Sequence, residues 1–346
     1  MKLRKVDSKN MFNAIINFPK NIDDALKIAK KFKFKSKYYK IDNVVISGMG
    51  GSAIGGDIVS ALGKENIDIP LTISRNYTLP NWVGKNSLVI CSSYSGNTEE
   101  TLSCLEDALK KNAQICGITT GGILKSKLNE LNKDVFITPS GLQPRAALAY
   151  SLIPISKILE KLDVLKIGFD IWLDEFLKNI KDYQTIYCLE GQKNPTYDLA
   201  RKIYKKIPII YADNSTLSVV ATRMKGQISE NSKMLAYQND LPELNHNEIV
   251  GWENNLNILN NLAVIWLKDE SDHERNKYRQ NITKNILDKI NIKQFSVRVE
   301  GNSFQERFLH MLHFGDWLSY WCAMLHKTDP NPVFKIDRLK NSLESL

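Results

Sequence analysis

The stretch from Glu230 to Glu253, ENSKMLAYQNDLPELNHNEIVGWE, concentrates side chains that can move protons. Its four glutamates and one histidine stand among amides and apolar residues: Glu230, Glu243, His246, Glu248 and Glu253. The hydrophobic pattern is too irregular for a plain helix or strand. Proton transfer needs an acid or base held in place by apolar neighbours, so this stretch is a candidate catalytic segment. A solvated loop with a helix cap is the structural alternative.

Two turns rich in small and hydroxylated residues precede this stretch. The first, Gly48–Asp57 (GMGGSAIGGD), follows a short apolar strand and opens a helix. Backbone N–H groups at such a junction attract anions. Its spacing departs from the dinucleotide fingerprint GxGxxG, and close packing of the helix on the sheet would also explain the glycines.

The second turn, SSYSGNTEET, lies at the next strand-to-helix junction. It carries four hydroxyls, on Ser93, Ser95, Thr98 and Thr101. Hydroxyls and backbone N–H groups together are suitable donors for a phosphate monoester. Capping of the following helix by Ser95 or Asn97 would explain one of these side chains and leave the others unexplained.

Arg145 is expected in the first turn of a helix after the fifth strand, within PRAALAYS. Pro144 is typical of the first helical position. The helix dipole disfavours a cation there, so we expect an anionic substrate group or a developing enediolate beside Arg145. A surface salt bridge is the alternative.

These motifs lie in an alternation of strands and helices that is typical of α/β proteins. Apolar runs in the first half predict strands near 43–49, 69–75, 87–94, 113–120 and 134–140. Those in the second half predict strands near 185–191, 207–213, 262–268 and 295–301. Parallel strands need helical crossovers, so each half is expected to be a parallel sheet of about five strands flanked by helices.

The repeated pattern predicts two domains in the 346 residues, which suffice for two cores. The first is expected at 1–162, with a leading helix near 9–33. A linker is expected at 163–183. The second domain is expected at 184–346 and holds the candidate catalytic segment and a long helix near the C-terminus.

The composition indicates a globular protein of the cytoplasm. The chain has no signal-peptide pattern and no uncharged apolar run of ~18 residues, so no membrane partner is expected. Its net charge of +9 favours anionic ligands. No recognition-helix or RNA-binding signature is present, and no nucleic acid partner is expected. The five cysteines form no CxxC pair, which favours reduced thiols.

Seven short motifs together resemble those of the sugar isomerase (SIS) domain proteins, and within them the two-domain bifunctional phosphoglucose/phosphomannose isomerases. In order they are GGS, SYSGNTEET, PRAAL, ENSK, ELNHNEIVGWE, HFGDW and DPNPV. The resemblance extends from about Asp42 to Lys340 and implies two SIS domains, each an α-β-α sandwich. SYSGNTEET alone would indicate only an SIS domain, whereas the order and context of all seven are specific.

The resemblance implies roles for individual residues by matching motifs. The substrate-binding residues would be Gly51, Ser52, Ser93, Ser95 and Thr98. The catalytic residues would be Arg145 for the enediolate, Glu230 as the base, His246 for ring opening and Lys340 as an assisting lysine, with Lys335 as its competitor. In the family the matching histidine comes from the neighbouring subunit, so a homodimer is expected. Neither a cofactor nor a metal is expected.

The resulting expectation is an aldose–ketose isomerase. It would interconvert glucose 6-phosphate and mannose 6-phosphate with fructose 6-phosphate through a cis-enediol. Some members carry a threonine at the position of Val333, and the missing hydroxyl puts the mannose activity in question.

Three alternatives stay open. The chain could be a sugar-phosphate-binding SIS regulator, or an isomerase for another phosphosugar. It could also be a metal-dependent isomerase that uses His310 and His313, three residues apart on the last long helix. The apolar neighbours of these two histidines favour a structural role.

Overall fold

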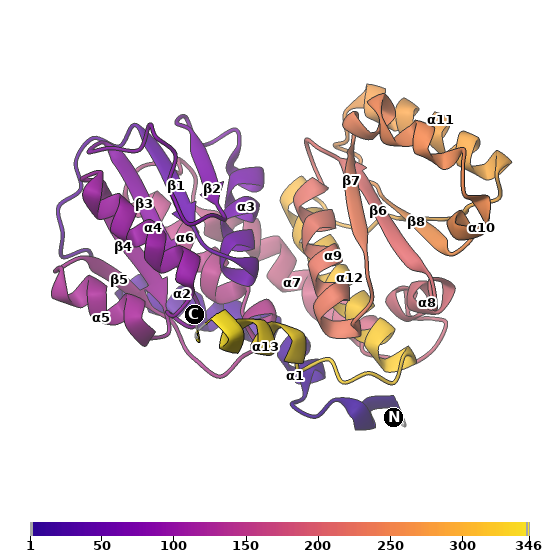
Figure 1. The fold of residues 1–346 in the computed structure, drawn as a ribbon, viewed down its shortest axis with the longest axis horizontal. Helices are drawn as coiled ribbons and strands as arrows, with labels where there is room; N and C mark the ends of the chain where they lie inside the picture. Colours follow the sequence, from indigo (N-terminus) through magenta and orange to yellow (C-terminus); the bar gives the residue numbers. More distant parts are fainter. Residues whose placement is uncertain (1–2, 344, 346) are drawn as a thin grey trace. The chain divides into compact units, whose positions relative to one another are not determined.

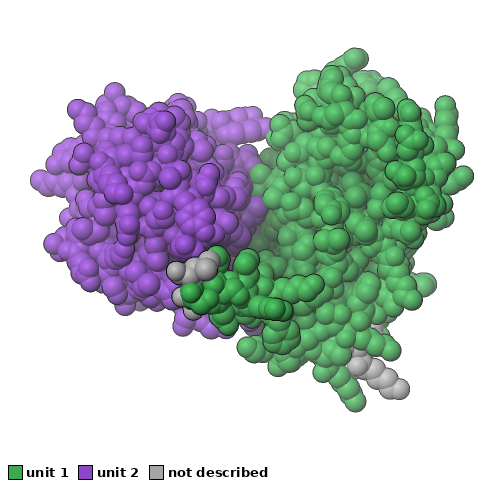
Figure 2. All heavy atoms as spheres, in the orientation of Figure 1, with its two compact units in different colours: residues 1–16, 175–346 green, residues 17–174 purple. Residues whose placement is uncertain are grey.

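The computed structural model describes residues 3–343 and 345. The chain divides into two compact units, coloured separately in Figure 2. One is Asn17–Asp174, and the other joins Met1–Ile16 to Glu175–Leu346. The division falls inside the segment 163–183. That segment is not an extended linker throughout, because helix α7 (Phe169–Tyr187) begins within it.

The unit Asn17–Asp174 is built on a five-stranded parallel sheet in the order β2-β1-β3-β4-β5 (Figure 1). Its strands are β1 (Asn43–Ser47), β2 (Leu71–Ser74), β3 (Ser87–Ser92), β4 (Gln114–Thr119) and β5 (Asp134–Ile137). Its helices are α2 (Phe18–Lys31), α3 (Gly50–Gly63), α4 (Glu99–Lys110), α5 (Gly122–Glu130) and α6 (Ala149–Lys161). All five predicted strands are confirmed.

Both faces of this sheet are covered, which explains why its strands are nearly continuous apolar runs. Val44, Val45 and Ile46 of β1 are fully buried. Helices α2 and α3 pack against α6. Apolar residues of α4 and α5 form a core with Val45 and Val89 on the opposite face, as right-handed crossovers require.

The other unit contains a four-stranded parallel sheet in the order β7-β6-β8-β9. Its strands are β6 (Ile207–Asp213), β7 (Tyr237–Leu241), β8 (Leu262–Leu267) and β9 (Lys293–Val297). Its helices are α1 (Met11–Ile16), α8 (Pro195–Lys202), α9 (Ser218–Ser232), α10 (Leu256–Leu259), α11 (Glu274–Lys289), α12 (Phe304–Leu325) and α13 (Phe334–Leu343). Helix α12 is buried along most of its length and packs against α8 and α9. The predicted α/β class with two parallel sheets is confirmed.

The strand predicted at 185–191 is wrong, so this sheet has four strands and not about five. Residues up to Tyr187 continue helix α7. Tyr183 and Tyr187 are one helical turn apart, and both pack against His310 of α12, with the Tyr183 and His310 rings stacked at 3.5 Å. A short apolar run does not show whether its hydrophobic periodicity is that of a strand or of a helix. Packing against α12 makes these residues helical. Strand β7 was not predicted and lies inside the candidate catalytic segment.

The helix predicted near 9–33 is two helices, α1 and α2, which belong to different units. The interruption lies just before Pro19, which occupies the first turn of α2. Within residues 3–343 and 345, no helix has the length and apolar character needed to cross a membrane.

Candidate active site

The first turn of α3, which follows β1, brings the predicted residues Gly51 and Ser52 against two other segments. Ser52 Oγ accepts a hydrogen bond of 3.1 Å from the N–H of Tyr94, in the loop after β3. A Cβ added to Gly51 would lie 2.5 Å from the carbonyl oxygen of Pro144. Glycine is therefore required where this turn meets the turn that carries Arg145.

The loop after β3 is shaped by its own hydroxyls. Ser93 Oγ lies 2.7 Å from Thr98 Oγ1 and accepts a hydrogen bond of 3.1 Å from the N–H of Gly96. Gly96 has a φ of +74°, and a Cβ there would lie 1.9 Å from the carbonyl oxygen of Gly121. These contacts place Ser93 and Thr98 side by side at the carboxyl end of β3.

Thr98, and neither Ser95 nor Asn97, is the N-cap residue of α4. Ser95 Oγ accepts from the N–H of Asn97 at 3.2 Å, and Asn97 Oδ1 accepts from the N–H of Ile123 at 3.0 Å. The predicted side-chain cap is therefore wrong, because Ser95 hydrogen bonds within its own loop and Asn97 bonds to the first turn of α5. Ser95 is exposed, and no side chain caps the first turn of α4.

Arg145 lies in a separate short 3-10 turn, Pro144–Ala146, and α6 begins only at Ala149. The prediction of one long helix through Arg145 is wrong at this end, although Pro144 does occupy the first position of its turn. The side chain of Arg145 is 4% exposed. Such burial excludes the alternative of a surface salt bridge.

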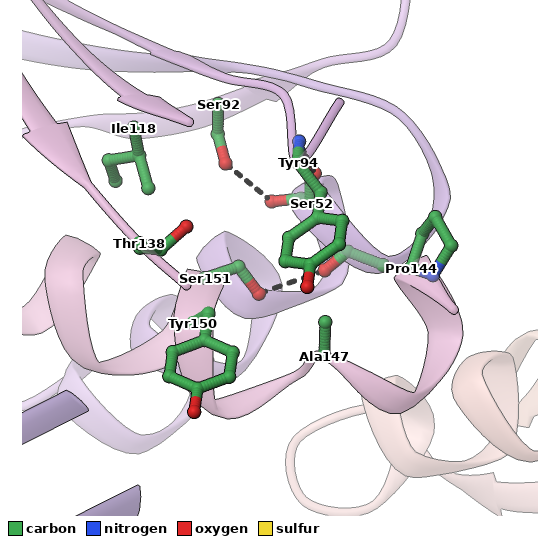
Figure 3. Close-up of a pocket in the computed structure, with 10 residues that line it drawn as sticks. Ser52, Ser92, Tyr94, Ile118, Thr138, Pro144, Ala147, Tyr150 and Ser151 are labelled. Carbon is green, nitrogen blue, oxygen red and sulfur yellow. Dashed lines mark hydrogen bonds between the residues drawn. The ribbon is translucent and has the colours of Figure 1, made fainter. Parts of the chain in front are cut away.

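A hollow opens at the carboxyl ends of β3, β4 and β5, and Figure 3 shows the residues around it. It is narrow, with room for about one water molecule, and is lined by Gly51, Ser52, Ser92, Tyr94, Ile118, Thr138, Pro144, Ala147, Tyr150 and Ser151. The Tyr94 hydroxyl donates to Pro139 O at 2.9 Å and accepts from Leu142 N–H at 3.2 Å. Burial raises the pKa of Tyr94, so it stays a neutral donor.

Several of these lining residues escaped the sequence analysis, notably Ser92, Thr138 and Ser151. Ser92 ends β3, and Thr138 directly follows β5. Their position at the carboxyl ends of parallel strands is the signal that could have found them, because ligands bind at this edge of α/β sheets. Ser151 lies inside α6 and gave no such signal.

Glu230 lies in the last turn of α9 and is half-buried. The three residues after it anchor this helix end. Asn231 Nδ2 donates to Ser319 Oγ at 2.9 Å, and Ser232 Oγ donates to the Ser319 carbonyl at 3.0 Å. Lys233 Nζ donates to the carbonyls of Glu230, at 2.9 Å, and Asp329, at 2.7 Å. ENSK thus combines one candidate base with three residues that fix its position.

Hydrogen bonds of the DPNPV motif connect this end of α9 to residues near the N-terminus. Asn331 Nδ2 donates to Asp329 Oδ1 at 3.0 Å and to Asp7 Oδ1 at 2.7 Å. Asp7 in turn accepts from the N–H groups of Met11 and Phe12 at the start of α1. Residues more than 300 positions apart therefore support the end of α9.

His246 ends a short turn, Glu243–His246, and is exposed. The turn itself is fixed, because Asn245 Nδ2 donates to Thr283 Oγ1 at 2.8 Å. Glu248 is engaged by the hydroxyl of Tyr211 and by Asn239 Nδ2. Trp252 is part of the core. Asn245 and Glu248 therefore hold the part of the segment that presents His246.

Within one chain, Glu230 lies near the amino ends and His246 near the carboxyl ends of the strands in the β7-β6-β8-β9 sheet. Helix α9 follows β6 and runs back along it, so Glu230 lies near the amino end of β7. Strand β7 is parallel to β6 and leads to the turn of His246 at the carboxyl end. Strand β7 alone spans about 13 Å, so Glu230 and His246 lie toward opposite ends of this strand.

Lys335 and Lys340 both lie on α13 and are exposed. Five residues correspond to about 140° around a helix, so the two amines leave it on different faces. Val333 precedes α13, and its carbonyl accepts from Ile336 and Asp337 N–H groups.

His310 and His313 of α12 are engaged in the core. His310 Nδ1 lies 2.8 Å from the carbonyl of Glu300, so this nitrogen carries the proton, and Nε2 accepts from the Tyr187 hydroxyl at 2.7 Å. His313 Nε2 accepts from Trp317 Nε1 at 2.9 Å. Burial lowers the pKa of His310 to about 4 and that of His313 to about 3. Both are neutral packing residues, as their apolar neighbours suggested.

Comparison with known proteins gives related sequences over nearly the whole chain. It is 43% identical to the bifunctional phosphoglucose/phosphomannose isomerase of Caldicellulosiruptor bescii, over 97% of this chain and 99% of that protein. It is 39% identical to the protein of the same description from Aquifex aeolicus, over 87% and 90%.

Residues 192–343 match the family model of the bacterial phospho-glucose isomerase C-terminal SIS domain. Among solved structures, a hypothetical protein from Thermus thermophilus superposes with a TM-score of 0.73 at 13% identity, over 99% of this chain and 92% of that one. At that identity the likeness supports the fold alone.

Proposed function

Because the chain belongs to the family of bifunctional phosphoglucose/phosphomannose isomerases, we propose that it interconverts glucose 6-phosphate and mannose 6-phosphate with fructose 6-phosphate. One observation carries the proposal. The two hydroxyl-bearing loops and the turn of buried Arg145 meet around Gly51 and Ser52. Donors for a phosphate and a cation for a developing enediolate are therefore available in one region.

The phosphate binds to the loops after β1 and β3. Ser52, Ser93, Ser95 and Thr98 supply hydroxyls, and the first turn of α4 has no side-chain cap to occupy its N–H groups. Glu99 and Glu100 already complement the dipole of this helix. Hydrogen bonds, more than the dipole, therefore bind the phosphate.

Glu230 transfers the proton between C2 and C1. In the aldose-to-ketose direction it removes the proton from C2, and the electron pair forms the C1–C2 double bond while negative charge develops on O1. Arg145 stabilises this charge. Glu230 then returns its proton to C1 as the proton of the C2 hydroxyl passes to O1, which yields the ketose. Both epimers can use one base if the enediol turns about its C2–C3 bond before the reverse transfer.

Ring opening is assigned to His246 of the partner subunit in a homodimer. This assignment is supported by the positions of Glu230 and His246 toward opposite ends of β7, whose five residues span about 13 Å. Lys340 on α13 assists. The reaction takes place in the cytoplasm, in keeping with the free thiols of the five cysteines.

The test is a coupled assay of the purified protein with fructose 6-phosphate and a chelator. Glucose 6-phosphate and mannose 6-phosphate are measured as separate products, and we expect both. A protein that turns over none of the three sugar phosphates would contradict the proposal.

Glu230→Gln examines the base, because glutamine keeps the size of the side chain but cannot accept the proton. We expect kcat to fall about 10²- to 10⁴-fold. Glu253→Gln, at an exposed glutamate of the same segment, is the control and should keep the parent rate. A Glu230→Gln protein with the parent rate would show that the base is wrongly assigned.

The shared site is tested by mixing Glu230→Gln and His246→Ala subunits. Each heterodimer then has one site with neither substitution, so random exchange should restore roughly a quarter of the parent activity. No recovery in subunits that demonstrably exchange would refute donation of the histidine across the interface.

A further inference from the structure

Thr138 carries a buried hydroxyl in the wall of the hollow that Figure 3 shows. Its backbone N–H donates to the carbonyl of Thr119 at 2.9 Å, which fixes the residue at the end of β5. The side chain is 4% exposed. Thr138 Oγ1 has no hydrogen-bond partner within the described residues.

The neighbouring hydroxyls of Ser92 and Ser151 already donate hydrogen bonds to backbone carbonyls. Ser92 Oγ donates to the carbonyl of Ser52 at 3.3 Å, and Ser151 Oγ donates to that of Gly51 at 2.9 Å. Both bonds hold the Gly51–Ser52 turn (Figure 3). A buried hydroxyl without a hydrogen-bond partner is unfavourable and rare. We therefore expect a ligand in the hollow to hydrogen bond to Thr138 Oγ1.

The lining identifies this ligand as small and neutral. Ile118 and Ala147 are apolar, and none of the described lining residues is charged, so a phosphate would be poorly solvated there. The space is narrow and admits a water molecule but not a sugar ring. A buried water needs two to four polar partners. Thr138 Oγ1 and the free lone pairs of the Ser92 and Ser151 hydroxyls can supply them.

We propose that Thr138 holds one ordered water that braces the Gly51–Ser52 turn against the end of β5. Through this water Thr138 is a positioning residue for substrate binding, and this role rests on the proposed isomerase function. Without the water, Ser92 and Ser151 lose a shared partner and the turn is less well fixed. The turn keeps its close packing against Pro144, so Arg145 stays in place and the loss falls on substrate binding.

The experiment compares Thr138→Val with the conservative control Thr138→Ser. Valine keeps the shape but removes the hydroxyl, and serine keeps the hydroxyl. High-resolution crystal structures should contain a water within hydrogen-bond distance of residue 138 in the parent and in Thr138→Ser, and none in Thr138→Val. The KM for fructose 6-phosphate should rise about 5- to 10-fold in Thr138→Val only, with kcat within about twofold of the parent.

Two results would overturn the proposal. One is a parent structure with no water at Thr138. The other is a KM that is unchanged in Thr138→Val or raised equally in both variants. If the parent protein has no isomerase activity, the proposed function fails, and the crystal structures still decide whether Thr138 holds the water.

Discussion

Gly51→Ala should damage catalysis by displacing the turn that carries Arg145. The new Cβ would meet the Pro144 carbonyl oxygen at 2.5 Å, and the carbonyl carbon at 3.0 Å. Real Cβ atoms essentially never approach closer than 3.0 Å, and ordinary contact begins at 3.4 Å. The two turns must therefore separate by between about 0.5 and 0.9 Å, the differences between 2.5 Å and these two limits. Backbone on both sides forms the contact, so no flexible side chain can relieve it.

The expected cost follows from this displacement. A misplacement of about 1 Å in an active site can cost 10²-fold in rate, so we expect kcat/KM for fructose 6-phosphate to fall about 10- to 100-fold. Overpacking should also lower the free energy of unfolding by about 1–3 kcal/mol. This loss alone would not reduce the activity of the folded protein.

The assay couples glucose 6-phosphate formation to a dehydrogenase, and urea unfolding of each variant verifies that it is folded at the assay temperature. Gly84→Ala is the matched control, because a Cβ there meets nothing within 4 Å. It should leave kcat/KM unchanged. A folded Gly51→Ala protein with kcat/KM within about twofold of the parent would refute the reasoning, because the turns would then tolerate separation.

Three further predictions concern stability and the lysine assignment. Burial raises the pKa of Asp272 from 3.8 to about 6. Protonated Asp272 therefore contributes its full share to the free energy of unfolding below about pH 4, and this contribution is lost as the pH rises through 6. Asp272→Asn should therefore gain up to about 3 kcal/mol relative to the parent between pH 4 and pH 7, measured by urea unfolding, and an equal difference at both pH values would contradict this. Gly96 has a φ of +74°, and the Cβ introduced by Gly96→Ala would lie 1.9 Å from the Gly121 carbonyl oxygen. The substitution should lower the free energy of unfolding by at least about 2 kcal/mol. A smaller loss in the same measurement would show that the loop adapts. Lys340→Ala should reduce kcat about 10-fold or more while Lys335→Ala keeps it, and the opposite ranking in the coupled assay would reassign the lysine.

Much of the unit Asn17–Asp174 could be predicted from the sequence because its signals are local. Its strands are mostly apolar, and the glycines and hydroxyls of its loops follow directly after strands. The carboxyl ends of neighbouring parallel strands meet at one edge, so Ser52 and Ser93 could be expected near each other. The family membership was equally accessible, because short motifs in a fixed order carry it.

The predictions that failed depended on partners far away in the sequence. Residues 185–187 are helical because Tyr183 and Tyr187 pack against His310, more than 120 residues further on. Asn97 does not cap α4 because its side chain accepts a hydrogen bond from Ile123 in the first turn of α5. No local pattern contains these contacts.

In the candidate catalytic segment, too, the sequence determined some properties and the tertiary structure determined others. Its sequence alone identified Glu230 and His246 as groups that can move protons, since residue type sets acid–base chemistry. Only the tertiary structure decided that Asn231, Ser232 and Lys233 anchor the base, and that Glu230 and His246 lie toward opposite ends of β7. Chemistry is carried by individual residues, whereas position depends on strand order and on hydrogen bonds between distant segments.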